Sequence, residues 1–293
     1  MTAFTAARPT VSPARIGASM AVLSILCVQL GLAVAVNLID DLGVAGVTWL
    51  RLAWAGLILI VVVRPRPSDF SSSAFRATVV LGVVTSGTAL FFMASIARLP
   101  LGTASALEFL GPLGVAVLRG RGASRIWPVV AAVGVVCLTQ PWTGESDALG
   151  VAFALAAAVC WGVYIVLTQH VGDQVAGIKS LAVSMPVAAL VATVVAAPST
   201  IERLTPELVL IGLGLAILLP VVPFTLEFLA LRRLTTAAFG TLMSLEPAFA
   251  LLIGFIVLNQ RPDALGVLGI ACVVVAGIGA ERTGGRDVVP TPV

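Results

Sequence analysis

Long apolar runs make up most of this chain, and charged residues are confined to short islands between them. A helix needs about 20 apolar residues to cross a bilayer. Cutting the chain at its Pro, Gly and charged clusters leaves ten stretches near that length. They cover residues 17–36, 43–63, 76–97, 101–118, 126–141, 148–169, 177–197, 206–230, 235–258 and 264–281. The pattern predicts an all-α polytopic membrane protein with ten transmembrane helices.

The overall composition favours the same conclusion. The 293 residues are 59% hydrophobic and 11% charged, whereas an ordinary soluble domain is about 25% charged. This excludes a soluble globular enzyme. The net charge of +3 is too small and too dispersed for a nucleic-acid surface, so the expected surroundings are a lipid bilayer, with no nucleic-acid partner.

Motifs for nucleotide, metal or covalent chemistry are absent from the sequence. It contains no Walker, HExxH or GxSxG pattern. Cys27, Cys137, Cys160 and Cys272 lie inside apolar runs without a CxxC spacing, so we interpret them as helix-packing residues. We therefore expect no cofactor and no metal, and secondary transport or facilitated diffusion rather than a self-contained ATP-driven pump.

The connections between the stretches carry basic residues unevenly. With the N-terminus in the cytoplasm, thirteen Lys and Arg residues fall on the inner side, and only Arg98, Arg203 and Arg261 fall outside. Positively charged loops resist translocation. No A-x-A cleavage site follows the first apolar run, so we interpret that run as a membrane helix. Both termini are expected to be cytoplasmic.

The two halves of the chain resemble each other. Shifts of 135 and 131 residues align identical residues in the same order. The aligned pairs include Arg98 and Arg233, Pro112 and Pro247, Cys137 and Cys272, and Gly31 and Gly162. Each half holds five predicted helices, an odd number, so the second half enters the membrane with opposite polarity. The sequence predicts two inverted repeats, residues 1–142 and 143–293, as in alternating-access carriers with a site near the bilayer midplane.

Three carboxylates lie inside predicted helices: Glu108, Glu227 and Glu246. A carboxylate in hydrocarbon is costly, so it faces a cavity, pairs with a cation or holds a proton. Two interpretations stay open for each residue, namely binding of a substrate ammonium group or coupling proton, and a bond to a neighbouring helix. Glu227 is an equally good candidate for a structural ion pair, because Arg232 and Arg233 follow closely. Glu246, near the middle of its helix, is the best site candidate.

Pro112 and Pro247 occupy equivalent positions in the two halves. A proline inside a helix removes a backbone hydrogen bond, bends the axis and frees carbonyl groups. We therefore predict a helix break at each proline. The break either lines a site or serves only as a packing kink.

Polar and aromatic residues suggest a binding surface on the first stretch and on its repeat counterpart, the sixth. Gln29 and Asn37 lie on the first, and Trp161 and Tyr164 on the sixth. Amide and hydroxyl groups beside aromatic rings suit a small zwitterionic or amphipathic solute. The alternative is an aromatic belt at the membrane interface. His170, the only histidine, is expected in a solvated loop.

Arg51 lies about eight residues into the second stretch. It is either buried against an acidic partner or snorkels toward Asp40 or Asp41. A contact with a substrate carboxylate is a third interpretation, which the sequence favours less than a structural pair.

A stripe of small residues recurs at every fourth position along the sixth stretch. Such a stripe lets another helix approach closely, and we interpret it as a packing face. Its members are Gly150, Ala154, Ala158 and Gly162.

Several motifs resemble the EamA family of the drug/metabolite transporter superfamily. They are Val44–Leu52 and Leu107–Leu113 in the first half, and Leu229–Leu234 and Leu242–Ala248 in the second. The resemblance covers nearly the whole chain, and its details are most similar to the threonine and homoserine exporter branch. It implies a ten-helix carrier of the bacterial inner membrane that exports amino acids or related metabolites. Where members of the family commonly have Gly-Glu, this chain has Asn259-Gln260.

The leading hypothesis is a secondary exporter of small amino acids, similar to threonine or homoserine, or of related metabolites. The first, fourth, sixth, eighth and ninth helices would line a central cavity. Glu108 and Glu246 would meet an amine or a proton, and a proton gradient is the candidate energy source. Two alternatives stay open: a multidrug or cationic-compound exporter of the same architecture, and a non-transporting scaffold or lipid-handling protein.

Overall fold

The computed structural model describes residues 13–119, 126–140, 147–172, 178–231, 233–234 and 236–283. Within these residues, seven helical spans are long and apolar enough to cross a membrane, and three shorter apolar helices accompany them. Together they match the ten predicted stretches. The prediction of an all-α polytopic membrane fold is confirmed.

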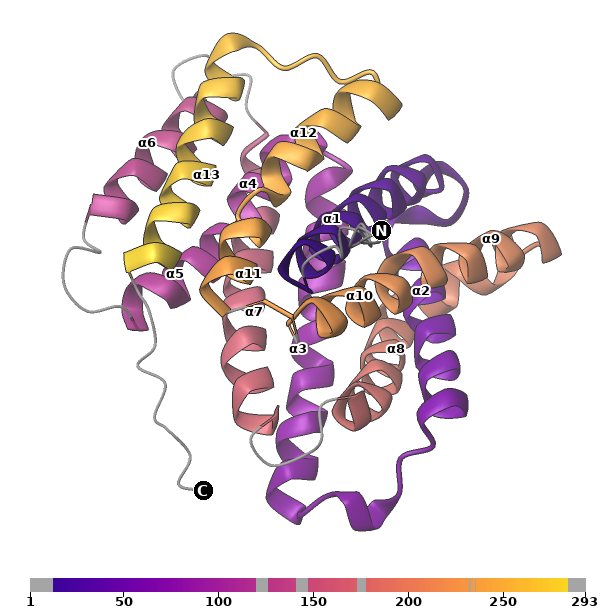
Figure 1. Ribbon diagram of the computed structural model, residues 1–293. Helices are drawn as coiled ribbons and strands as arrows, with labels where there is room; N and C mark the ends of the chain where they lie inside the picture. Colours follow the sequence, from indigo (N-terminus) through magenta and orange to yellow (C-terminus); the bar gives the residue numbers. More distant parts are fainter. Residues whose placement is uncertain are drawn as a thin grey trace, which may run out of the picture.

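The first half of the chain contributes six of the helices labelled in Figure 1. They are α1 (Pro13–Asn37), α2 (Ile39–Val63), α3 (Ser72–Ile96), α4 (Leu101–Glu108), α5 (Leu110–Arg119) and α6 (Ile126–Thr139), with the short turn η1 (Pro67–Asp69) between α2 and α3.

The second half contributes the remaining helices. They are α7 (Ala148–Gly172), α8 (Ile178–Thr200), the short turn η3 (Ile201–Arg203), α9 (Pro206–Ala216), the π-helical turn η4 (Ile217–Val221), α10 (Val222–Leu231), α11 (Thr236–Met243), α12 (Glu246–Val257) and α13 (Ala264–Thr283). Three predicted stretches are therefore two helices in tandem: α4 with α5, α9 with α10, and α11 with α12.

The helix interruptions in the two halves lie slightly before the prolines that were expected to cause them. The first falls at Phe109, so Pro112 lies in the first turn of α5. The second falls just before Glu246, so Pro247 lies in the first turn of α12. Proline fits the first turn because its missing N–H leaves no helical bond unmade there. Each interruption thus places a glutamate at a helix end.

A third interruption, between α9 and α10, was not predicted. Leu219 has an extended backbone, with φ −155° and ψ 102°, and Pro220 follows it inside the turn η4. Gly31 of α1 faces this turn, and a Cβ there would come within 2.9 Å of the Leu219 Cβ. The interrupted span therefore packs tightly against α1.

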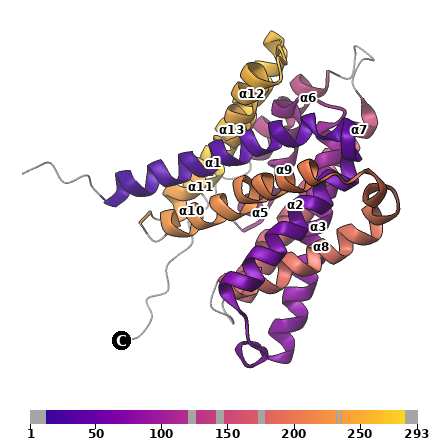
Figure 2. The same cartoon turned by 90° about the vertical axis from the view of Figure 1, so that its right-hand side faces the viewer.

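Helices of the two halves pack against one another in equivalent pairs. α2 packs on α8, α4 on α12 and α6 on α13, and each pair joins one predicted helix to its repeat counterpart. α1 lies along α10 in Figure 2, and its counterpart α7 lies along α3. If each helix is replaced by its counterpart in the other half, the same pairs of helices are in contact.

The stripe of small residues on α7 packs as expected. Ala154 and Ala158 are buried, and α5 crosses α7 beside them. A Cβ added at Gly111 of α5 would collide with the carbonyl oxygen of Ala158. The two helices are as close as their backbones allow.

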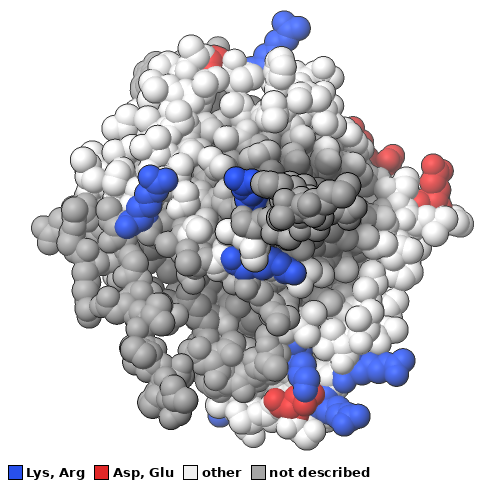
Figure 3. Space-filling view, viewed as in Figure 1, with Lys and Arg blue, Asp and Glu red and all other residues white. Residues whose placement is uncertain are grey.

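The outer surface of the bundle is largely apolar. Leu57, Leu190 and Val194 are exposed, with Val194 at 83%. Figure 3 shows few charged side chains on the face that it presents, with a group of both signs at the lower edge, where Figure 1 shows the α2–α3 connection. Such a surface suits hydrocarbon rather than water.

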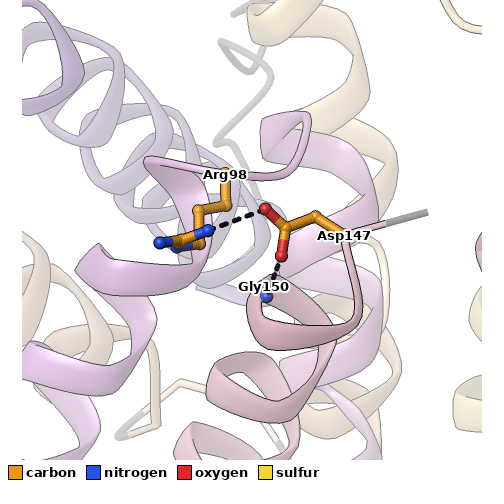
Figure 4. Close-up of polar contacts among 3 residues, drawn as sticks. All are labelled: Arg98, Asp147 and Gly150. Atoms are coloured by element: carbon orange, nitrogen blue, oxygen red, sulfur yellow. Dashed lines mark hydrogen bonds and ion pairs between the residues drawn. The ribbon is translucent and has the colours of Figure 1, made fainter. Parts of the chain in front are cut away.

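Polar contacts join the two halves where α3 passes into α4. Arg98 Nη1 lies 2.9 Å from Asp147 Oδ2, and Asp147 Oδ1 accepts the Gly150 N–H at 2.8 Å, which caps α7 (Figure 4). The Gly150 N–H and the Arg98 guanidinium hold the pKa of Asp147 below its usual range. Gln260 Oε1 accepts the N–H of Leu101 at 2.8 Å at the start of α4. The amide oxygen of Gln260, in the second half, therefore caps the first turn of α4.

A further contact joins the halves at the end of the bundle that carries the α2–α3 connection. Lys179, at the start of α8, donates to Asp69 Oδ1 at 2.7 Å. This hydrogen bond, together with one from the Arg66 N–H, lowers the pKa of Asp69. Both ends of the bundle therefore carry polar links between the halves.

Candidate functional site

The three glutamates singled out in the sequence come together inside the bundle. Glu108 ends α4, Glu246 begins α12 and Glu227 lies on α10. The charge of Glu246 acts on Glu108, and that of Glu227 acts on Glu246. The carboxyl groups thus form a string with Glu246 at its centre, which we call the glutamate string.

Helix α1 runs beside the glutamate string and supplies hydrogen-bond donors to it. Gln29 is fully buried, and its Nε2 donates to Glu246 Oε1 at 3.2 Å. Ser24 is also fully buried, and its Oγ donates to Glu227 Oε1 at 2.7 Å. The two donors are five residues apart, a little more than one helical turn, so one helix serves two carboxylates.

Arg51 of α2 is buried next to the same string. Arg51 and Glu108 are each only 7% exposed. The charges of their side chains act on each other. Asp40 and Asp41 lie exposed at the start of α2. Of the interpretations left open, burial near an acidic group describes the structure, with Glu108 as that group.

Helix α7 brings both of its predicted aromatic residues to the string. Trp161 meets Phe109 edge to face, with ring centroids 6.2 Å apart, at the interruption beside Glu108. Tyr164 lies close enough to Glu227 to sense its charge. Both rings therefore face the bundle interior rather than a belt on its surface.

Glu227 was expected either to take part in the site or to form a structural ion pair with Arg232 or Arg233. Ser24 is its hydrogen-bond donor, whereas Arg233 Nη1 donates to the Leu229 carbonyl at 2.9 Å. Arg232 lies outside the described residues. Within the described residues, the hydrogen-bond donor of Glu227 is therefore a hydroxyl on α1, 203 positions away in the sequence.

The structure does not bring Asn37 to the string. It is the last residue of α1 and is exposed, eight residues and so about 12 Å along the axis from Gln29. His170 is exposed, as expected, but it lies in the last turn of α7 and not in a loop. The candidate site therefore consists of the three glutamates with Gln29, Trp161 and Tyr164.

Sequence reasoning did not single out Ser24 or Phe109, and it ranked a substrate contact of Arg51 below a structural pair. Ser24 is one hydroxyl in an apolar run, and its only signal is its spacing from Gln29. Phe109 marks the α4–α5 interruption, but nothing in its type predicts that. The described residues contain no group of three His, Cys, Asp or Glu side chains able to hold a metal ion, so the chemistry on offer is that of carboxylates, amides and one guanidinium.

Comparison with known proteins identifies the family of this chain. The sequence profile of the EamA-like transporter family matches residues 148–279. Over 264 residues, the chain is 36% identical to the threonine/homoserine exporter RhtA of Salmonella typhimurium strain LT2, covering 89% of each chain. The chain belongs to the EamA-like transporter family. The protein of the same name from Escherichia coli strain K12 is also 36% identical, over 87% of this chain and 88% of that one. The resemblance to the threonine/homoserine exporter branch is confirmed.

More distant similarities agree with membership of the EamA family. An uncharacterized transporter of Clostridium kluyveri is 23% identical over 54% of each chain. A solved crystal structure, 18% identical, superimposes with a TM-score of 0.57 over 93% of this chain and 98% of its own; it shows the fold alone. The EamA protein described here is therefore a polytopic membrane transporter with a small-molecule substrate.

Proposed function

We propose that this protein is a secondary exporter of small amino acids, similar to threonine or homoserine, or of related metabolites. The observation that carries the proposal is the 36% identity, over 89% of each chain, to exporters of threonine and homoserine. The excess of basic residues in one set of connections supports a location in the bacterial inner membrane with both termini in the cytoplasm. In that orientation the Arg98–Asp147 contact lies at the outer end and Lys179–Asp69 at the inner end.

The proposed mechanism is alternating access between two inverted repeats, residues 1–142 and 143–293. Contacts that stay the same when the halves are exchanged support this division. The glutamate string lies among helices of both halves, since Glu108 belongs to the first and Glu227 and Glu246 to the second. Rocking one half against the other would then change access to the string from one side of the membrane to the other.

The chemistry of the string suits an ammonium group and a proton as alternative occupants. A carboxylate buried in a membrane protein is stabilised by a bound cation or by protonation. Glu246 lies at the centre of the string, between two like charges that it can relieve by accepting a proton. We propose that Glu246 exchanges substrate for a proton, so that the proton gradient drives export.

Efflux of labelled amino acids from cells that express the protein tests this function. We expect faster loss of threonine or homoserine, which stops when the proton gradient is collapsed with an uncoupler. Cells that carry verified membrane-inserted protein but show no added amino-acid efflux would contradict the proposal. Tolerance of those cells to a panel of toxic amines would then point to a cationic-compound exporter instead.

A further inference from the structure

Two buried polar atoms near the glutamate string have no hydrogen-bond partner among the described residues. They are Arg51 Nε and Gln29 Oε1. Arg51 is 7% exposed and Gln29 is fully buried. Buried polar groups in native proteins are nearly always bonded, so each exception calls for an explanation.

One of the two atoms is a hydrogen-bond donor and the other is an acceptor. Arg51 offers an unused N–H beside Glu108, and Gln29 offers an unused carbonyl oxygen while its amide donates to Glu246. Glu108 and Glu246 are in turn coupled to each other. An open donor near Glu108 and an open acceptor beside Glu246 therefore flank the glutamate string, in the series Arg51, Glu108, Glu246 and Gln29.

A zwitterionic amino-acid head group carries the groups that this series lacks. Its carboxylate accepts hydrogen bonds, and a guanidinium is the side chain best suited to bind a carboxylate. Its ammonium group donates hydrogen bonds, which a carbonyl and a carboxylate accept. We propose that Arg51 binds the substrate α-carboxylate and that Gln29 Oε1 with Glu246 binds the α-ammonium group, so that the transporter selects free zwitterions. This inference rests on the proposed amino-acid export and specifies how that site recognises its substrate.

Rejection of incomplete substrates follows from burial. A site built to hydrogen-bond a group discriminates strongly against analogues without it, because its own polar atoms then stay unpaired. Threonine methyl ester keeps the ammonium group but has no free carboxylate, and N-acetylthreonine keeps the carboxylate but has no ammonium group. Each should therefore bind about ten- to hundredfold more weakly than threonine.

Competition against labelled threonine in proteoliposomes of the purified wild-type protein gives the first test. The apparent affinities of threonine, threonine methyl ester and N-acetylthreonine are compared in counterflow. Weak competition by both analogues supports the proposal. Competition by the methyl ester as strong as that of threonine overturns it, and it does so without any variant.

Variants of Arg51 separate recognition from a merely structural role. Arg51→Gln should weaken threonine competition about ten- to hundredfold and abolish the preference for threonine over its methyl ester, with Arg51→Lys intermediate. Arg76→Gln is the matched control, since Arg76 is exposed on α3 and its Nε bonds only the Ser72 carbonyl of its own helix. Arg51→Gln protein that keeps the wild-type preference overturns the proposal.

The outcomes distinguish this inference from the function on which it rests. Wild-type protein that moves no amino acid contradicts the proposed function and the inference together. Wild-type protein that moves threonine without discriminating against the methyl ester overturns the inference and leaves export standing. Should Arg51→Gln fail to fold, the wild-type competition series decides.

Discussion

Each glutamate of the glutamate string has a different neighbour. Glu108 has the charge of Arg51 nearby, Glu246 has an amide donor and Glu227 has a hydroxyl donor. Glu108 is the one of the three with an opposite charge nearby, although burial and the charge of Glu246 act against that charge. Glu246 has a neutral donor and two acidic neighbours, which is why we propose it as the coupling group.

Neutralising Glu246 should separate transport from the proton gradient. Gln at this position still bonds Gln29 but cannot exchange a proton, so we expect Glu246→Gln to lose the pH dependence of efflux and to lower its rate at least about tenfold. Vesicle efflux measured over a range of external pH checks this. Glu207→Gln, at an exposed position at the start of α9, is the matched control. Unchanged rate and pH dependence in Glu246→Gln would show that Glu246 is not the coupling group.

Removing the Ser24 hydroxyl should destabilise the fold. Ser24→Ala removes the hydroxyl donor of the half-buried Glu227, which costs about 1–3 kcal/mol. Thermal unfolding in detergent should show a lower Tm for Ser24→Ala than for Ser19→Ala, because Ser19 is exposed and bonds only the Ile16 carbonyl. Equal Tm values in the two variants would mean that the Ser24–Glu227 bond adds no stability.

Individual site residues could be predicted where a polar side chain stands inside an apolar run. Glu108, Glu227, Glu246 and Gln29 are polar groups in apolar runs, and the fold brings all four together. Asn37 has the same signal, yet it lies at the end of α1, because the position of a helix end depends on packing rather than on composition. The bonds that a glutamate makes across the bundle, such as that to Ser24, depend on tertiary contacts that no local pattern contains.

Two features define the helices of this bundle: the positions of their interruptions and the closeness of their packing against one another. The interruptions at Phe109 and before Glu246 followed from two prolines at equivalent repeat positions, although each lies a few residues earlier than predicted. The interruption at Leu219–Pro220 was missed, because Pro220 stands inside a long apolar run that otherwise indicates one helix. Its tight contact with Gly31 of α1 appears only once the helices are packed.

Two glycines of α5 should respond in opposite ways to alanine. A Cβ at Gly111 would collide with the Ala158 backbone, whereas a Cβ at Gly114 would meet nothing within 4 Å. We expect Gly111→Ala to cost about 1–3 kcal/mol of stability through overpacking, and Gly114→Ala to gain about 0.5–1 kcal/mol through helix propensity. The Tm and the yield of monodisperse protein measure both. A Gly111→Ala variant as stable as Gly114→Ala would contradict the close approach of α5 and α7.

The cap at the start of α7 should not contribute to the pH dependence of transport. Hydrogen bonds from Gly150 and Arg98 lower the pKa of Asp147, so its stabilising contribution is complete above the ordinary aspartate pKa and is lost only as pH falls through the lowered value. Between pH 5 and 8 Asp147 therefore stays ionised. We expect Asp147→Asn to keep the shape of the wild-type efflux profile over this range; a shifted profile would assign pH sensing to the end of the bundle that carries Asp147.

The ten-helix architecture of the molecule was predicted from the sequence, because each apolar stretch indicates one membrane-spanning helix. The contacts between equivalent helices of the two halves could not be derived from any one stretch, since they depend on how the helices pack. Polar links at both ends hold the halves together around the glutamate string. Under the alternating access that we propose, exposing the string to one side would break the links at that end.

Threonine movement in proteoliposomes of the purified protein under an imposed proton gradient tests proton-coupled export. We expect labelled threonine to move opposite to the proton flow and to reverse direction when the gradient is reversed. Dissipating the gradient should leave only exchange. Threonine movement that ignores the size and sign of the gradient, or no threonine movement at all, would contradict proton-coupled amino-acid export.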